Sequence, residues 1–138
     1  MDDFYREFIL DHYKRPRNFG TLEDPDITHE EDNPFCGDRI RIDVRLREGH
    51  VVDVRFTGQG CAISTAAASI LTDKIKGAPI ERIKAFSKEE MLQALGIPLS
   101  PVRLKCGLLA LKVLKTGLYG IKGWPGEEEG RARENVDE

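Results

Sequence analysis

The sequence predicts an α+β fold: a small antiparallel β-sheet, made of a hairpin plus a possible extra strand, packed by about four to five helices in a single compact domain. Three observations lead to this prediction. One segment alternates apolar and charged residues over nine positions, and a tight turn joins it to a second alternating segment. Other segments carry helix start and stop signals. A length of 138 residues suits one domain that buries most of its apolar surface.

The first element expected is a short helix over Asp2–Tyr13. Aromatic and aliphatic residues recur there at helical spacing, and the aspartates at positions 2 and 3 can cap the helix start. The R-P-R-N-F-G run at 15–20 ends this helix. Acidic and proline-bearing residues from Thr21 to Pro34 then predict a loop that leads to the first cysteine.

The next segment is predicted to be an antiparallel hairpin. Apolar residues at 40, 42, 44 and 46 form one face of its first strand, and Glu48-Gly49 supplies a tight turn. Val52, Val54 and Phe56 continue in a second strand. The opposite face of the first strand is expected to be wet and carries Arg39, Arg41, Asp43, Arg45 and Arg47. Closure of the hairpin places residues before its first strand beside residues after its second.

A helix of small residues is predicted from Ser64 to Lys76, with Gly77 as its C-terminal stop. Cys61 precedes this helix closely. The free amides and the positive dipole end of a helix N-terminus stabilise a thiolate. The sequence therefore predicts that this thiol lies where its ionised form is favoured.

Two further helices follow. Ser87 and Glu90 form a capping box for a short helix that ends near Gly96. Ser100-Pro101 is a helix cap followed by proline at the first helical position. Leucines at 104, 108, 111 and 114 predict a long helix with a buried face beyond it. The domain is expected to span residues 1–125, and the charged tail at 126–138 is expected to be disordered.

Composition excludes several classes of protein. A net charge of −3 gives no clustered basic face of the kind that binds nucleic acid. No apolar run approaches the roughly 20 residues that span a membrane. The acidic N-terminus lacks the features of a signal peptide. Three cysteines without a secretion signal indicate reduced thiols, so a cytoplasmic location is expected.

The candidate functional residues are the three cysteines and one aspartate. Cys36, Cys61 and Cys106 each adjoin a glycine, which lets backbone approach an ion or cluster closely. Asp38 follows the first cysteine by two residues and adds an oxygen donor. The three sulfurs and one oxygen make a four-ligand set. Because 24 and 44 residues separate the cysteines (61 − 36 − 1 and 106 − 61 − 1), only a folded domain brings them together.

Several kinds of site fit scattered cysteines. A free cysteine is usually a small buried apolar residue. Structural zinc sites typically use close C-x-x-C pairs, and permanent electron-transfer clusters normally have four cysteines. A carboxylate in place of one thiolate weakens the grip on an iron–sulfur core, because hard oxygen suits it less well than sulfur. Such a site can hold a cluster and also release it. A cysteine hydrolase is disfavoured because His12, His29 and His50 lie outside the cysteine motifs.

Four motifs resemble those of the U-type iron–sulfur cluster assembly proteins, which comprise the NifU-like, IscU-like and SufU-like proteins. They are I-L-D-H-Y-K-R-P-R-N-F-G at 9–20, N-P-F-C-G-D at 33–38, G-Q-G-C-A-I-S at 58–64 and P-V-R-L-K-C-G-L-L-A at 101–110. The resemblance extends from about residue 4 to 120. It implies a compact α+β domain on which a cysteine desulfurase and an iron donor build a 2Fe–2S cluster for transfer to apo-proteins. It also implies that Cys36, Asp38, Cys61 and Cys106 hold this cluster, or zinc when no cluster is loaded.

The sequence departs from the family patterns at two places. IscU-like members commonly have histidine just before the third cysteine, where this chain has Lys105. This lysine and the G-C-A-I-S sequence resemble the SufU-like branch, yet the 44-residue gap is too short for the insertion that SufU-like members usually carry. The chaperone-binding L-P-P-V-K motif of IscU-like proteins has only a partial counterpart in L-S-P-V-R at 99–103, so a chaperone partner stays open.

Two functions therefore remain open: a non-enzymatic scaffold that assembles and passes on a 2Fe–2S cluster, which we favour, and a zinc-bound sulfur acceptor. In the second function the protein would act as a sulfurtransferase. A cysteine desulfurase would deliver sulfur to Cys36, Cys61 or Cys106. The missing histidine favours the second function, and the missing insertion favours the first.

Some neighbouring residues have two interpretations. Lys105 can offset the negative charge of the site or be a solvated helix residue, and Arg39 can orient the Asp38 carboxylate or meet solvent. The aromatic residues of the N-terminal helix can form a docking surface for the desulfurase or pack against the core, which is the commoner case; they are Phe4, Tyr5 and Phe8.

Overall fold

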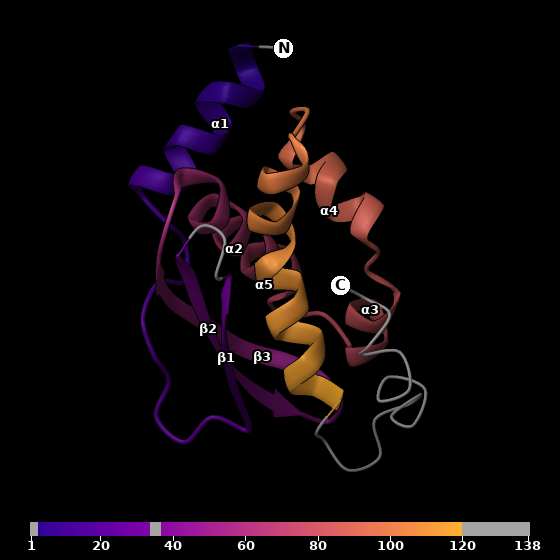
Figure 1. Ribbon diagram of the computed structural model, residues 1–138. Helices are drawn as coiled ribbons and strands as arrows, with labels where there is room; N and C mark the ends of the chain where they lie inside the picture. The colour runs from indigo at the N-terminus through magenta and orange to yellow at the C-terminus, as the bar shows by residue number, and fades with distance from the viewer. Residues whose placement is uncertain (1–2, 34–36, 120–138) are drawn as a thin grey trace.

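A three-stranded antiparallel sheet forms the base on which the helices pack (Figure 1). The computed structural model describes residues 3–33 and 37–119. The strands β1 (Ile27–Asn33), β2 (Asp38–Arg47) and β3 (His50–Gln59) lie in chain order, with β2 in the centre. Together with five helices in the described residues, this arrangement confirms the predicted α+β fold and its possible extra strand.

The extra strand β1 corrects the prediction of a loop from Thr21 to Pro34. Its residues are mostly acidic or polar, which is why local composition indicated a loop. Ile27 and Asn33 are nevertheless buried, and exposed residues alternate with less exposed ones between them. A full antiparallel ladder with β2 and packing against α5 outweigh the weak strand propensity of the segment.

The predicted hairpin of β2 and β3 is confirmed, with Glu48 and Gly49 both at positive φ in its turn. Two details differ from the prediction. A bulge between Arg45 and Leu46 shifts the register, so Val51 is buried and Val52 is exposed. Asp43 is buried on the face that was expected to be wet.

The burial of Asp43 has a local cause, because β1 and the chain before it supply hydrogen-bond donors to its carboxylate. This carboxylate accepts hydrogen bonds from the Thr28 hydroxyl at 2.7 Å and from the Leu22 amide at 3.1 Å. Arg41 Nε lies 3.0 Å from the same group. A buried carboxylate with these donors satisfies its hydrogen-bonding capacity within the fold.

Five helices complete the described fold: α1 (Asp3–Lys14), α2 (Ala62–Ile75), α3 (Ile80–Ala85), α4 (Lys88–Leu95) and α5 (Pro101–Tyr119). The Ser87 side chain accepts from the Glu90 amide at 3.0 Å, and Gly96 ends α4, as predicted, in the left-handed conformation. The capping box is seen only in this half, because the Glu90 carboxylate pairs with Arg82. Helix α5 begins at the proline that the sequence indicated. Helix α3 was not predicted, because it has six residues and no side-chain cap.

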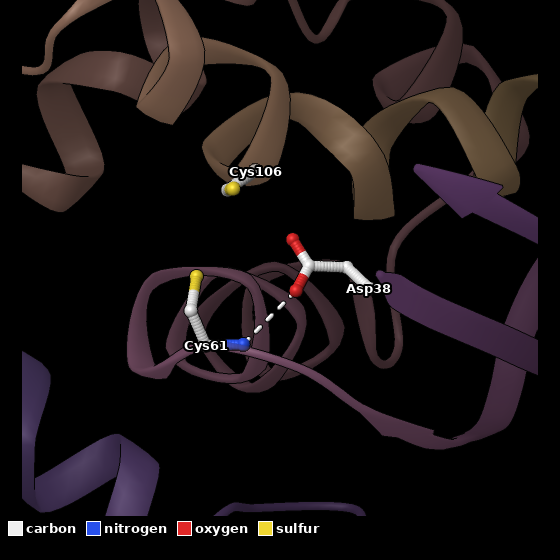
Figure 2. Close-up of side chains that lie close together, drawn as sticks. All are labelled: Asp38, Cys61 and Cys106. Atoms are coloured by element: carbon white, nitrogen blue, oxygen red, sulfur yellow. Dashed lines mark hydrogen bonds between the residues drawn. The ribbon is translucent and has the colours of Figure 1, made fainter. Parts of the chain in front are cut away.

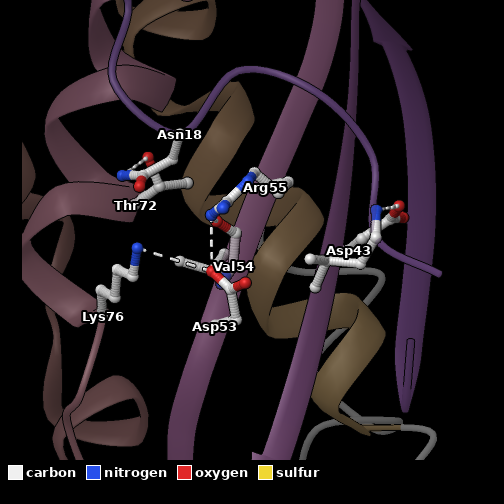
Figure 3. A network of polar contacts seen from close by, with 8 residues as sticks. Asn18, Asp43, Asp53, Val54, Arg55, Thr72 and Lys76 are labelled. Atoms are coloured by element: carbon white, nitrogen blue, oxygen red, sulfur yellow. Dashed lines mark hydrogen bonds and ion pairs between the residues drawn. The ribbon is translucent and has the colours of Figure 1, made fainter. Parts of the chain in front are cut away.

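The core lies between the sheet and the helices α2 and α5 (Figure 1). Ile40, Ile42 and Val44 of β2 supply its sheet side and are almost completely buried. Polar contacts join the C-terminal end of helix α2 to neighbouring segments. There, Asn18 Nδ2 donates to Thr72 Oγ1 and Lys76 pairs with Asp53 (Figure 3). Among the described residues, every helix is too short or too polar to cross a lipid bilayer. Residues 120–138, which include the predicted tail, lie outside the described residues.

Candidate metal centre

Three of the predicted ligands meet at one end of the sheet. One ligand atom from each of Asp38, Cys61 and Cys106 lies within 4.8 Å of the other two. Figure 2 shows the Cys61 sulfur and one Asp38 oxygen pointing toward Cys106. Residues separated by up to 68 positions along the chain (106 − 38) thus share one small site.

Each ligand is held by a different element. Asp38 is the first residue of β2 and Cys61 is the N-cap of α2, so hairpin closure brings them together as the sequence predicted. Cys106 lies in the second turn of α5 and is fully buried, whereas Cys61 is half-buried. Both of these cysteines are free thiols. The packing of α5 over the sheet therefore completes the cluster.

The Asp38 carboxylate is buried and only half satisfied. Its Oδ1 accepts a hydrogen bond from the Cys61 amide at 2.9 Å. Its Oδ2 is buried and has no hydrogen-bond partner among the described residues, and the side chain as a whole is 1% exposed. Because an unpartnered buried carboxylate oxygen is costly, a positive ligand at this point would stabilise it. The donor set of sulfur and oxygen fits zinc, which binds both types of atom.

Gly60 makes the close approach of Asp38 possible. Its φ is +149°, and a Cβ at this position would lie 2.2 Å from Asp38 Oδ1 and 2.9 Å from the Ser64 hydroxyl oxygen. Only glycine leaves room for the carboxylate beside the start of α2. The sequence indicated this role in general terms, since each cysteine adjoins a glycine.

Two polar residues that sequence reasoning did not single out contact the sulfurs. Ser64 Oγ lies 4.0 Å from Cys61 Sγ and donates to the Cys61 carbonyl at 3.1 Å. Asn33 Nδ2 donates to Cys106 Sγ at 3.9 Å. Ser64 stands in the quoted G-Q-G-C-A-I-S motif and Asn33 in the quoted N-P-F-C-G-D motif, and these motifs were the signal for both residues. The loop prediction gave no reason to expect that Asn33 is buried beside Cys106.

The fourth predicted ligand, Cys36, lies outside the described residues. The flanking residues Asn33 and Gly37 are joined by a hydrogen bond from the Gly37 amide to the Asn33 carbonyl at 2.8 Å. Asn33 also pairs with Asp38 across β1 and β2. The described part of the site therefore consists of one carboxylate and two thiols.

Comparison with known proteins identifies the family. A family model described as the NifU-like N-terminal domain matches residues 4–127. The chain belongs to this family. The match covers the sheet, the described helices and all four predicted ligands.

Two named relatives of this NifU-like domain differ in their stated roles. The chain is 40% identical to the zinc-dependent sulfurtransferase SufU of Bacillus subtilis, over 89% of this chain and 95% of the relative. It is 32% identical to the iron–sulfur cluster assembly scaffold protein IscU of Azotobacter vinelandii, over 86% of this chain and 94% of the relative. A crystal structure titled as a putative scaffold protein for the SUF system from Fervidobacterium islandicum is similar with a TM-score of 0.68 and 28% identity, covering 80% and 93% of the two chains.

The charged neighbours of the NifU-like site differ from one expectation. Arg39 does not orient Asp38; it donates from Nε to Asp32 at 2.9 Å and lies 3.5 Å from Glu30. These carboxylates are on β1, across the exposed face of the sheet, and they attract the guanidinium away from the buried site. Lys105 is exposed next to Cys106, and both interpretations of it stand.

The histidines have contacts of their own away from the ligand cluster. His12 is buried with Nδ1 2.7 Å from the Ser69 hydroxyl, and His29 Nε2 lies 2.8 Å from Glu31. Burial lowers the pKa of His12, and the positive charge of Arg17 lowers it further. Phe8 packs edge-on against the His12 ring and against the core, as helix packing predicted; the Phe4 and Tyr5 side chains lie outside the described residues.

Proposed function

We propose that this protein is a scaffold in iron–sulfur cluster assembly, on which a 2Fe–2S cluster is built and from which it is transferred to apo-proteins. The observation that carries the proposal is the buried Oδ2 of Asp38, which has no hydrogen-bond partner in the described part of the chain and lies beside the thiols of Cys61 and Cys106. Cys36 is proposed as the fourth ligand, because it stands two residues before Asp38 in the same motif.

The mixed donor set suits a cargo that is held and then released. Thiolates bind iron–sulfur cores and zinc strongly, whereas a carboxylate is a harder donor that suits iron–sulfur cores less well. Replacing one of four thiolates with Asp38 weakens the hold on the cluster. When no cluster is loaded, the same four residues would hold zinc, which keeps the thiols deprotonated.

A second function, that of a zinc-bound sulfur acceptor, is favoured by Lys105 and by the 40% identity with a zinc-dependent sulfurtransferase. In this reaction a thiolate of the protein attacks the terminal sulfur of a persulfide on the desulfurase. The sulfur–sulfur bond of that persulfide breaks, and the desulfurase cysteine leaves as a thiolate. The product is a persulfide on this chain, at Cys36, Cys61 or Cys106.

Both functions require the same sulfur donor, and the scaffold also requires iron. A cysteine desulfurase is proposed to supply sulfur, an iron donor supplies iron to the scaffold, and apo iron–sulfur proteins receive the product. A cytoplasmic location, where thiols stay reduced, is proposed from the odd number of cysteines in the sequence.

Anaerobic reconstitution with ferrous iron, cysteine and a cysteine desulfurase separates the two functions. The scaffold is expected to develop visible sulfur-to-iron charge-transfer absorbance, with two irons and acid-labile sulfide per monomer or per dimer. A Cys61→Ser variant is the control and is expected to lose most of this absorbance. A colourless protein that keeps stoichiometric zinc and accelerates the desulfurase would contradict the scaffold function and support the sulfur-acceptor function. A protein that neither forms a cluster nor accelerates the desulfurase would contradict both functions.

A further inference from the structure

Asn33 is a buried polar residue at the edge of the ligand cluster. It is the last residue of β1, is 5% exposed, and belongs to the face of the strand that also buries Ile27. Burying an amide is unfavourable unless it finds hydrogen-bond partners. Its Nδ2 donates to Sγ of Cys106, a residue of α5 that lies 73 positions further along the chain.

The position of Asn33 connects it with the other described parts of the site. Its backbone carbonyl accepts from the Gly37 amide at 2.8 Å, which joins the two ends of the segment that contains Cys36. It stands directly opposite Asp38 in the pairing of β1 with β2. A single residue thus contacts α5 through its side chain and the start of β2 through its backbone.

We propose that Asn33 is a positioning residue of the metal centre, whose amide holds the Cys106 sulfur toward Asp38 and Cys61 and tunes it as a ligand. This inference rests on the proposed function, since it assumes that these residues bind metal. Partners that hydrogen-bond to metal ligands orient them, and their loss typically lowers metal affinity about 10–100-fold. Asn33 is suited to this positioning role because its side-chain amide donates to Cys106 Sγ at 3.9 Å.

Space filling is the competing explanation, and it makes a different prediction. If the side chain only filled volume, leucine would serve as well, because it is similar in size and its burial costs no hydrogen bond. If the N–H group matters, leucine removes the effect while preserving the packing. An N–H donor withdraws charge from the sulfur, so it raises the energy at which an electron moves from sulfur to a bound metal.

The test uses cobalt(II) and zinc with the full chain and two variants, Asn33→Leu and Asn33→Ala. Thr28→Val is the matched control, because it removes a 2.7 Å hydrogen bond from the same strand to Asp43 without touching a sulfur. Both Asn33 variants are expected to bind zinc about 10-fold more weakly in chelator competition. Their sulfur-to-cobalt absorption band is expected at lower energy than in the unchanged protein. The control variant is expected to match the unchanged protein in both measurements.

The possible failures are distinguishable. An Asn33→Leu variant with unchanged affinity and an unchanged cobalt band would overturn the role of Asn33 and leave the proposed function standing. An equal loss in Thr28→Val would also overturn it, because the effect would then come from loosening of β1. An unchanged protein that shows no sulfur-to-cobalt band would overturn both this inference and the metal centre on which it rests. Unfolding curves without metal show whether each variant is folded.

Discussion

Replacing Gly60 with alanine should disrupt the proposed metal centre without changing any of its proposed ligands. The new Cβ would lie 2.2 Å from Asp38 Oδ1 and 2.8 Å from its Cγ, a separation that real Cβ atoms do not adopt. The carboxylate therefore has to move, and its hydrogen bond to the Cys61 amide is lost. A φ of +149° adds backbone strain for any residue other than glycine.

The two costs can be separated with Gly20→Ala as a matched control. Gly20 has a similar φ of +137°, and nothing lies within 4 Å of a Cβ placed there. Both variants share the backbone strain of about 1–3 kcal/mol. Only Gly60→Ala also loses a hydrogen bond to a charged group, which contributes about 1.5–3 kcal/mol.

Thermal unfolding with and without zinc measures both effects. At a zinc concentration of about 100 times Kd, binding stabilises the folded state by about 2.7 kcal/mol, or roughly 10 °C in a domain of this size. We expect Gly20→Ala to keep this increase and Gly60→Ala to lose most of it. Equal zinc-induced shifts in the two variants would refute the argument that Gly60 holds the Asp38 carboxylate in the site.

Three further predictions concern single side chains. Asp38→Ala should lengthen the lifetime of the loaded cluster, because the hard oxygen donor is removed; unchanged transfer kinetics to an acceptor protein would count against it. Cys106→Ser should lower zinc affinity more than the loss of a residue that only hydrogen-bonds to a ligand, which typically lowers it about 10–100-fold. Chelator competition measures this loss of affinity. The lowered pKa of buried His12 means that its stabilising effect is present above the ordinary value of 6.5 and is lost as the pH falls through the folded-state pKa. Urea unfolding at pH 7.5 and 5.5 should show this loss, and a His12→Gln variant should lack it.

The half of the site formed by Asp38 and Cys61 could be predicted from local patterns. Strict alternation and a Glu48-Gly49 turn define the hairpin, and an antiparallel hairpin necessarily brings its two open ends together. Cys106 differs, because its place depends on how α5 packs over β1 and β2. No local pattern contains that information, and the family resemblance supplied the expectation.

The N-P-F-C-G-D motif includes Asn33, but its burial beside Cys106 could not be recognised because β1 was predicted to be a loop. Its acidic and polar residues have low strand propensity, and the ladder with β2 forms through tertiary contacts that composition does not reveal. The prediction for β3 also missed a detail. The register shift opposite Arg45 and Leu46 places Val51 in the core instead of Val52. Regular periodicity predicts a strand well, but an extra residue within the strand, here Val52 of β3, changes which residues are buried.

X-ray absorption of the stoichiometric zinc complex is the most direct measurement of whether Asp38, Cys61 and Cys106 share one ion with Cys36. We expect a first shell of about three sulfurs near 2.3 Å and one oxygen near 2.0–2.2 Å. The oxygen should disappear from the shell, or be replaced by water, in Asp38→Ala. A shell without sulfur, or a protein that fails to retain zinc, would contradict the central claim.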